Sequence, residues 1–540
     1  MRNVELKEGN QREQQVVQIR MRTILCSIRD HSKFESFFVL LVPLITTFIF
    51  YSCTCSQKLT WANHGNDGGD FLAAILTGGI PHPTGYPTYV LLGRLFQFLP
   101  VGDEYFRGVL LSFLPAAAAS GLLALWVNNV LVTREKYIRV ISSLLGGIGW
   151  GLSPLLWSQA VIVEVHGLQS LFLVCSLWLV TENLRANRHP GLILFLSWVF
   201  GLGLGNHITL VFMFPVVLYG LFVSYKNNKK LVFIFSQLGL ILLGLAIYLY
   251  IPIQARSYPP INWGNPTSID GFFWLVSGKA YQGLLFGITP ALFFDRLAAF
   301  FSMLREQFGI PGVIAGIVGL LNYQLNHKGI KASLIWIFVI YTLFSFVYST
   351  DDSTGYLLAS FMVFAIWISF GVNILFEMKL KLPIINFLVV FLVIVSFIIK
   401  IPGTFSDVTP AGRYAAAEYA ENLLEKIPQN AILLTDSDPD SFPVWYYHFG
   451  LKGRQDISVI VLPLTQFRWY QVTLLHVYPE LSFPALINDF ANNSIGWGEE
   501  LAVINGQERI ICRNKTGENK IVTGCSDGTS IESAFPNMDL

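Results

Sequence analysis

Long apolar runs separated by short polar segments fill most of the first 400 positions of the chain. A helix that crosses a membrane needs about 20 mostly apolar residues, and the chain contains about eleven runs of roughly that length. They lie near residues 36–54, 107–132, 139–157, 160–181, 190–205, 208–225, 231–253, 309–322, 332–349, 355–376 and 383–400. The pattern predicts a polytopic α-helical membrane protein.

The pattern changes after residue 400. Ala411–Ile427 has the spacing of an amphipathic helix, and Pro428 ends it. Beyond it, Ala431–Thr435 and Ile457–Leu462 are typical of strands, with a short helix predicted at Phe442–Phe449 between them. Alternating strands and helices predict a small α/β domain. The predicted domains are a leader at 1–35, a transmembrane domain at 36–400 with polar loops at about 55–106 and 254–308, and an α/β domain at 401–540.

The positions of Lys and Arg predict the orientation, because basic residues gather in the cytoplasmic loops of membrane proteins. Besides the leader, the basic loops are Arg134/Lys136/Arg139, Arg185/Arg188, Lys226/Lys229/Lys230, Lys328/Lys331 and Lys379/Lys381. Each follows an even number of predicted spans. We therefore expect a cytoplasmic N-terminus and an extracytoplasmic α/β domain, in a plasma membrane or the endoplasmic reticulum.

Composition narrows the class further. Of the 540 residues, 53% are hydrophobic and 13% charged, about half the charged share of soluble domains. The net charge is +1, from 36 basic and 35 acidic residues, so no overall field attracts nucleic acid. The sequence contains no GxxxxGK[ST] phosphate loop. We exclude an ordinary cytosolic enzyme, a nucleic-acid-binding protein and a nucleotide-driven pump.

Two carboxylates, Asp67 and Asp70, lie three residues apart in the first long polar stretch. They share a face if the chain is helical from Asp70 onward, and Asp67 then sits at the helix N-terminus, where the dipole favours an anion. An ionised carboxylate there can take a proton from a hydroxyl nucleophile. Asp67 can also be interpreted as a helix cap and Asp70 as a solvated residue, so both interpretations stay open.

His82 and Tyr86 lie in the segment Pro-His-Pro-Thr-Gly-Tyr-Pro at 81–87. Three prolines fix its backbone, and Gly85 permits a sharp turn. A loop stiffened in this way holds side chains in place at little entropic cost, which suits a binding site. A rigid connector with an incidental histidine is the alternative.

Four more ionisable groups fall at ends of the predicted spans. Glu164 and His166 lie near the start of the fourth span, where such residues are expensive and usually functional; they diverge by about 200° on a helix. His207 marks the turn between spans five and six, as a ligand or as a polar cap. Arg256 follows the seventh span beside aromatic residues, placed to hold a phosphate or to act as an interfacial anchor.

The predicted α/β domain carries two further features. Asp436-Ser-Asp438-Pro-Asp440 resembles the DxD of sugar-nucleotide enzymes, although Asp-Pro clusters commonly form turns, which we favour here. Cys512 and Cys525 would lie on the oxidising side and could pair. The sequence contains no HExxH or fixed-spacing Cys/His set, so it predicts no zinc site.

Several of these segments resemble one membrane family. Asn66-Asp67-Gly-Gly-Asp70 and His82-Pro-Thr-Gly-Tyr-Pro87 are similar to the signature of the transmembrane protein 260-like family, first catalogued as a domain of unknown function. Similar segments elsewhere are Val163–Gln169, Gly203–His207, Tyr250–Arg256 with Asn262-Trp263-Gly, and Ala431–Asp436 with Trp445-Tyr-Tyr. The resemblance implies a GT-C glycosyltransferase, a polytopic enzyme that takes a sugar such as mannose from a polyprenyl-phosphate carrier and keeps a functional acidic residue in its first outer loop.

The resemblance leads to a mechanistic hypothesis. A hydroxyl of a protein or glycan acceptor displaces the lipid phosphate on the extracytoplasmic face with inversion, and Asp67, or failing that Asp70, is the base. The expected substrate-binding residues are His82, Tyr86, Glu164, His166, His207 and Arg256. The sequence requires no cofactor besides the lipid-linked donor and names no metal. A lipid-linked sugar flippase or transporter is the rival; it predicts charged residues near the bilayer midplane.

Overall fold

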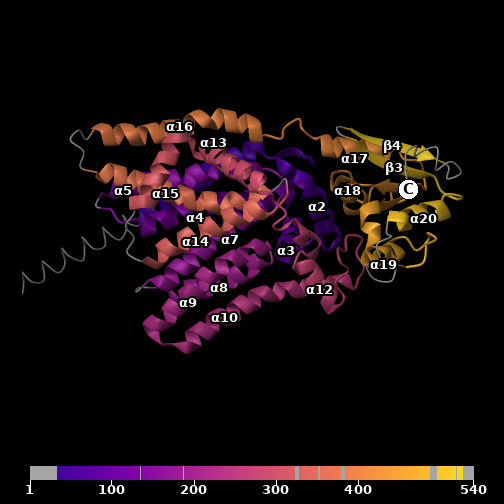
Figure 1. Cartoon of the computed structure of the whole chain (residues 1–540), viewed down its shortest axis with the longest axis horizontal. Coiled ribbons are helices and arrows are strands. Elements are labelled where there is room, and N and C mark those ends of the chain that lie inside the picture. Colours follow the sequence, from indigo (N-terminus) through magenta and orange to yellow (C-terminus); the bar gives the residue numbers. More distant parts are fainter. Residues whose placement is uncertain are drawn as a thin grey trace, which may run out of the picture.

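The computed structural model describes residues 33–526, except for 134, 186–187, 323–327, 351–352, 379–383, 487–494 and 518–519. The predicted leader at 1–35 therefore lies almost wholly outside the described residues. A large helical part fills most of the molecule, and a smaller α/β unit sits at one of its ends (Figure 1).

Each apolar run predicted from the sequence is helical over most of its length. Among the described residues, nine helices are long and apolar enough to cross a membrane, and the bent pair α5–α6 adds a tenth. The predicted run at 190–205 forms α8, which is apolar but shorter. The apolar helices are Lys33–Thr54, α4 (Glu104–Val130), α5 (Lys136–Gly151), α6 (Pro154–Ala160), α7 (His166–Leu184), α8 (Pro190–Leu204), α9 (Phe214–Asn228), α10 (Leu231–Leu245), α13 (Pro290–Asn322), α14 (Lys328–Val347), α15 (Leu358–Glu377) and α16 (Ile384–Val408). The polytopic α-helical prediction is confirmed.

Two boundaries differ from those that the sequence pattern predicts. The fourth span begins at His166 rather than near 160, because the chain leaves α6 and turns through 161–165 before α7 starts. The predicted loop at 254–308 begins at the end of α11 (Tyr250–Ala255) and contains α12 (Ile269–Val276) and the first half of α13. Charged residues such as Arg296 and Arg305 lower the mean hydropathy of that half. A search for long apolar runs therefore does not detect this part of the helix.

Glycines let the helices at the centre of the helical part touch. A Cβ atom on Gly319 of α13 would clash with the backbone of Trp367 in α15, and one on Gly371 of α15 would clash with the backbone of Ala315. Most of α15 is buried as a result, including Phe361. Close backbone approach through small residues is how helices pack inside membranes, where lipid offers no hydrophobic drive between helices.

The α/β unit is built on a four-stranded sheet in the order β2-β1-β3-β4. The central strand β1 (Ile432–Thr435) pairs in parallel with both β2 (Ser458–Val461) and β3 (Ile511–Gly517), whereas β4 (Lys520–Ser526) is antiparallel to β3. The other helices of the unit are α17 (Ala415–Lys426), α18 (Asp438–Trp445), α19 (Arg468–Val477) and α20 (Ile495–Asn505). The predicted α/β fold is confirmed, while β3 and β4 were not predicted.

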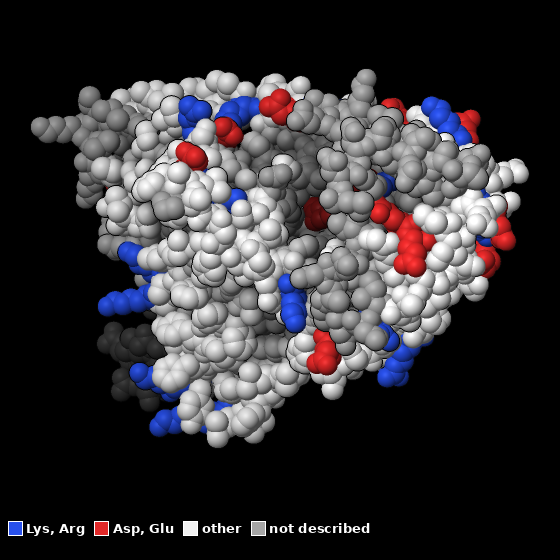
Figure 2. All heavy atoms as spheres, turned by 45° about the vertical axis from the view of Figure 1, so that its right-hand side comes forward, with Lys and Arg blue, Asp and Glu red and all other residues white. Residues whose placement is uncertain are grey.

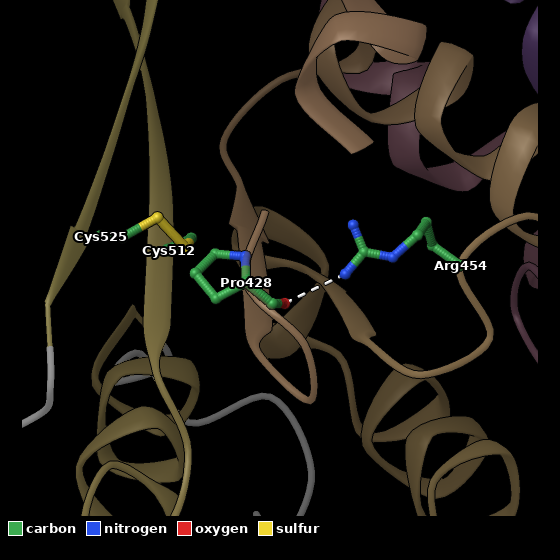
Figure 3. The surroundings of a disulfide bond; sticks show 4 residues. All are labelled: Pro428, Arg454, Cys512 and Cys525. Carbon is green, nitrogen blue, oxygen red and sulfur yellow. Dashed lines mark hydrogen bonds between the residues drawn. A yellow bond between two sulfur atoms is a disulfide. The ribbon is translucent and has the colours of Figure 1, made fainter. Parts of the chain in front are cut away.

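A disulfide links β3 to β4. Cys512 and Cys525 face each other in the strand register, and their sulfur atoms are bonded (Figure 3). To the right of the disulfide in this view, the Arg454 side chain donates a 3.1 Å hydrogen bond to the carbonyl of Pro428, which follows the C-cap residue of α17 (Figure 3). The pairing left open by the sequence is therefore present in the structure.

Short helices from the polar loops connect the two parts. They are η1 (Ala62–Asp67), α2 (Gly68–Thr77) and α3 (Pro87–Phe96), of which α2 packs against α18 of the α/β unit. A Cβ atom on Gly69 would clash with the carbonyl of Phe442, so only glycine permits this approach. Lys and Arg side chains gather at the opposite end of the helical part, away from the α/β unit (Figure 2).

Candidate functional site

Asp67 stands at the start of α2, where the sequence placed it. It occupies the N-cap position, but its side chain makes no capping hydrogen bond. The side chain keeps 34% of its surface exposed and lies 3.6 Å (Oδ2) from Nε2 of His82. The cap interpretation therefore leaves this carboxylate unexplained, while its exposure and its histidine neighbour suit a chemical role.

Asp70 lies one turn further along α2 and is completely buried. Its Oδ2 accepts hydrogen bonds from the backbone N–H of His82 at 2.9 Å and from Nδ1 of the same residue at 2.7 Å. Its Oδ1 accepts a 3.3 Å bond from the indole N–H of Trp263. The solvated interpretation of Asp70 is wrong, because the carboxylate fixes the His82 ring from behind and leaves Nε2 to face Asp67.

The stiff loop at 81–87 holds His82 between these two carboxylates. Tyr86 has a left-handed backbone (φ 42°) at the start of α3, and its ring meets the His82 ring edge-on at 5.0 Å. On the other side, Phe442 of α18 stacks on His82 at 6.3 Å. Gly85 needs its positive φ of 84° to turn the chain. The rigid loop is thus one wall of a site rather than a connector alone.

The charges around His82 determine its protonation. Burial alone lowers the pKa of this imidazole, but Asp67, Asp70 and Asp438 outweigh burial and raise the pKa to about 9. Burial raises the pKa of Asp438 to about 6, and the nearby Asp67 adds to the rise. His82 is therefore a cation at neutral pH, held among carboxylates from both parts of the protein.

Asp438 comes from the segment that resembles a DxD motif. Its two neighbours have structural roles: Asp440 forms a capping box with Ser437 at the start of α18, and Asp436 pairs with Arg513 at 3.4 Å. The turn interpretation is therefore right for these two residues. Asp438 alone turns towards the site, and sequence reasoning missed it because its helical partner α2 lies some 370 positions away along the chain.

A cavity of about 840 Å³ opens beside these residues. Six of the eight predicted site residues line it: Asp67, His82, Tyr86, Glu164, His166 and His207. It is also lined by polar residues that were not predicted as site residues: His64, Gln159, Tyr281, Tyr356 and Asp438. Figure 2 shows an acidic patch at the bottom of a hollow between the helical part and the α/β unit. Asp70 lies behind the wall, and Arg256 is exposed and absent from the lining.

Rings from four chain segments form a wall of the cavity that reaches His82 through Tyr86. His207 lies 5.6 Å from the ring of His166, 5.8 Å from Tyr356 and 5.9 Å from Tyr86. Burial, with the charges of neighbouring histidines, lowers the pKa of His207 to about 3, so it is neutral. Nδ1 of this ring accepts from Thr209 (backbone N–H, 3.3 Å; hydroxyl contact, 2.8 Å), which leaves its Nε2–H as a donor. The wall can stack against and donate to a polar, ring-shaped ligand.

Glu164 is buried in the turn before α7. Its Oε1 accepts a 2.7 Å hydrogen bond from the N–H of Val165, and its backbone exchanges two hydrogen bonds with the hydroxyl of Ser112 in α4. This anchoring fixes the start of α7 and with it His166. Glu164 thus contributes to the shape of the cavity as well as to its charge.

The far end of the cavity is apolar and reaches the surface of the helical part. Val211, Phe286 and Leu343 line it and are also 43%, 78% and 47% exposed. Val211 and Leu343 lie in helices apolar enough to span a membrane. A ligand could therefore have its polar end at His82 and its apolar end between the helices, facing lipid.

The described lining contains no lysine or arginine, and the described residues contain no group of three or more metal-ligating side chains. At the polar end of the cavity, the residue that we identify as positively charged is therefore His82. Carboxylates and one imidazolium in a partly apolar cavity suit the activation of a hydroxyl close to an anionic leaving group.

Comparison with known proteins confirms the resemblance seen in the sequence. Residues 67–231 match the family model "Protein O-mannosyl-transferase TMEM260 N-terminal domain", and residues 416–480 match "TMEM260-associated domain 2". The first match begins at Asp67 and the second contains Asp438, so the two matched regions meet at the site.

Two curated proteins of this kind are similar over most of the chain. The protein O-mannosyl-transferase tmem260 of Dictyostelium discoideum is 23% identical over 81% of this chain, and that of Mus musculus is 24% identical over 78%. The chain spans about 59% and 62% of the lengths of these relatives.

A solved structure has a similar fold. The crystal structure of ArnT from Cupriavidus metallidurans bound to undecaprenyl phosphate matches 83% of this chain and 96% of its own, with a TM-score of 0.51 and 10% identity. At this identity the likeness concerns the fold, and it confirms the GT-C-like architecture.

Proposed function

Because this chain resembles the transmembrane protein 260 family, we propose that it is a GT-C glycosyltransferase. It moves a sugar, mannose by the names of its relatives, from a polyprenyl-phosphate donor to a hydroxyl group of a protein or glycan acceptor. The observation that carries the proposal is a single cavity that joins an Asp67–His82–Asp70 arrangement to an apolar wall open to the surface of the spanning helices.

The donor has an apolar tail and a polar phosphate-sugar head, and each matches one end of this cavity. Its polyprenyl tail enters between Val211 and Leu343, and its phosphate and sugar lie towards His82. The His82 cation attracts the phosphate and stabilises the charge that develops on it as it leaves. The rings of His207 and Tyr356 pack against the sugar. Arg256, which lies outside the described lining, has no part in this arrangement.

Asp67 is the base. Its carboxylate takes the proton of the acceptor hydroxyl while the hydroxyl oxygen forms a bond to the anomeric carbon. The bond from that carbon to the phosphate oxygen breaks, and the lipid phosphate leaves with the electron pair, so the anomeric configuration inverts. Buried Asp70 is a positioning residue, because it touches His82 from behind. No step is assigned to a metal ion.

The chemistry takes place on the extracytoplasmic face in this proposal. Basic side chains gather at the end of the helical part away from the site (Figure 2), as expected of a cytoplasmic end. The Cys512–Cys525 disulfide belongs in an oxidising compartment. Polyprenyl-phosphate sugars serve as donors where nucleotide sugars are scarce.

The test uses purified protein in nanodiscs with a panel of polyprenyl-phosphate sugars. Slow donor hydrolysis releases lipid phosphate, which we expect from one donor with the wild type and with Asp103→Asn, a matched exposed cap on α4. Asp67→Asn should lower the release by about 10²- to 10⁴-fold, the usual contribution of a general base. Release that Asp67→Asn leaves intact would refute the base assignment. Flipping of a labelled donor across the bilayer without release would favour the flippase.

A further inference from the structure

A second cavity, of about 530 Å³, lies between α12 and the start of α19. Four aromatic side chains line it: Phe273 and Trp274 from α12, and Phe467 and Trp469 from the α/β unit. The ring of Trp274 lies 5.7 Å from Phe467 and 6.1 Å from Trp469. We call this cavity the aromatic groove.

The rim of the aromatic groove is polar and carries charge of both signs. Asp270 comes from the first turn of α12 and Lys279 from the segment after α12, and Gln466 and Arg468 come from the α/β unit. These side chains are exposed. A lipid tail needs a continuous apolar wall, so it does not fit. Two cations against one anion favour a ligand with negative charge beside its apolar surface.

The aromatic groove adjoins the proposed catalytic cavity. Ser277, directly after α12, lines both. Trp469 also lies 5.6 Å from the ring of Trp263, whose indole N–H binds the positioning residue Asp70. A chain bound in the groove would therefore pass the mouth of the cavity that contains Asp67.

We propose that the aromatic groove binds the acceptor as an extended polypeptide segment, with an apolar side chain on Phe273 and Trp274 and an acidic one near Lys279. This inference rests on the proposed function, because only a glycosyltransferase has an acceptor. Extended peptides are recognised in this way, with the backbone lying along a groove and alternate side chains held by its lining. A neutral glycan would gain nothing from the cations at the rim.

The test measures peptide binding apart from catalysis. The probe is a pool of fluorescent dodecapeptides, each with one threonine, one aromatic residue and one glutamate in varied order, added to the protein in nanodiscs. We expect saturable binding by the wild type. Phe273→Ala and Lys279→Glu should each weaken binding about tenfold or more, the equivalent of about 1.4 kcal/mol. Ile269→Ala on α12 and Lys452→Glu on the α/β unit are matched controls outside the groove, and should bind as the wild type does.

The outcomes separate this inference from the proposed function. Equal peptide binding by the wild type and both groove variants, with unchanged melting temperatures, would overturn the inference even if a donor is hydrolysed. Binding of a neutral oligosaccharide panel in place of the peptides, lost in Phe273→Ala, would also overturn it. Peptide binding that needs Phe273 and Lys279, without hydrolysis of any donor, would support the groove while the proposed function fails.

Discussion

The protonation of His82 is the feature of the site most open to measurement. Its pKa rises from an ordinary 6.5 to about 9 because Asp67, Asp70 and Asp438 outweigh the effect of burial. At about 1.4 kcal/mol per pKa unit, that rise corresponds to about 3 kcal/mol of preference for the protonated form in the folded protein. His82 is only 8% exposed, so solvent screens little of it.

This preference has a definite direction with pH. A group whose pKa is higher in the folded than in the unfolded protein stabilises the fold fully below its unfolded pKa, here near 6.5, and loses that effect as the pH rises through about 9. Donor hydrolysis should follow the same limb, because the leaving phosphate needs the His82 cation. We therefore expect activity to fall as the pH rises through about 9.

Asp70→Asn perturbs this balance without touching the cavity surface. It removes one of three carboxylates and should lower the pKa of His82 by about one unit. The alkaline limb of donor hydrolysis should move from about 9 to about 8, with Asp103→Asn as the control that does not move it. The melting temperature should fall below that of the wild type at pH 6, and the difference should shrink at pH 10. An alkaline limb that stays in place in Asp70→Asn would refute the charged state assigned to His82.

Three further changes test other parts of the structure. Asp438→Asn should raise the melting temperature at neutral pH, because it removes a carboxylate whose pKa is raised from 3.8 to about 6. The gain should shrink as the pH falls below about 6 and vanish near 3.8, and a lower melting temperature at neutral pH would contradict this. Replacing both Cys512 and Cys525 by serine removes a bond that closes a loop with a sequence separation of 13, which should lower the free energy of unfolding by about 3 kcal/mol. Denaturant-induced unfolding measures this change, and an unchanged free energy would mean that the bond does not form in the native protein. Arg256→Ala should leave the KM for the donor within about twofold, since surface substitutions usually change free energies by under about 0.5 kcal/mol; a large rise would return the phosphate to Arg256.

The sequence predicts the helical part well because a membrane imposes a strong, local constraint. A run of apolar residues long enough to span hydrocarbon has few alternatives to a helix, and each predicted run is helical over most of its length. Prediction failed where a helix is not continuously apolar, as in the charged first half of α13. It also failed for β3 and β4, whose alternation is short; the partner of β3 in the sheet, β1, lies about 80 residues earlier.

The site was harder to predict because its residues gain meaning from contacts between distant segments. The sequence places Asp67 and His82 in one loop region. It does not reveal that Asp70 is buried and accepts two hydrogen bonds from His82. Arg256 illustrates the same dependence: its aromatic surroundings suit a phosphate ligand or an interfacial anchor, and the structure places it exposed and outside the cavity lining, so its role stays a prediction. A local sequence pattern suggests which residues are candidates for the site. The distance of each candidate from His82 depends on tertiary packing, which the pattern does not contain.

The approach of α2 to α18 explains why this centre needs both parts of the protein. Only glycine at position 69 lets the backbone of Phe442 come close, and that contact brings α18, with Asp438 at its start, against the His82 loop. The same contact stacks Phe442 on His82 and shields the imidazolium from water, which strengthens its interactions with the carboxylates. The α/β unit is thus more than an appendage to the helices. It supplies one charge and one wall to the proposed catalytic cavity and, through Trp469, one side of the aromatic groove. In this arrangement, donor and acceptor meet only where both parts of the chain are in contact.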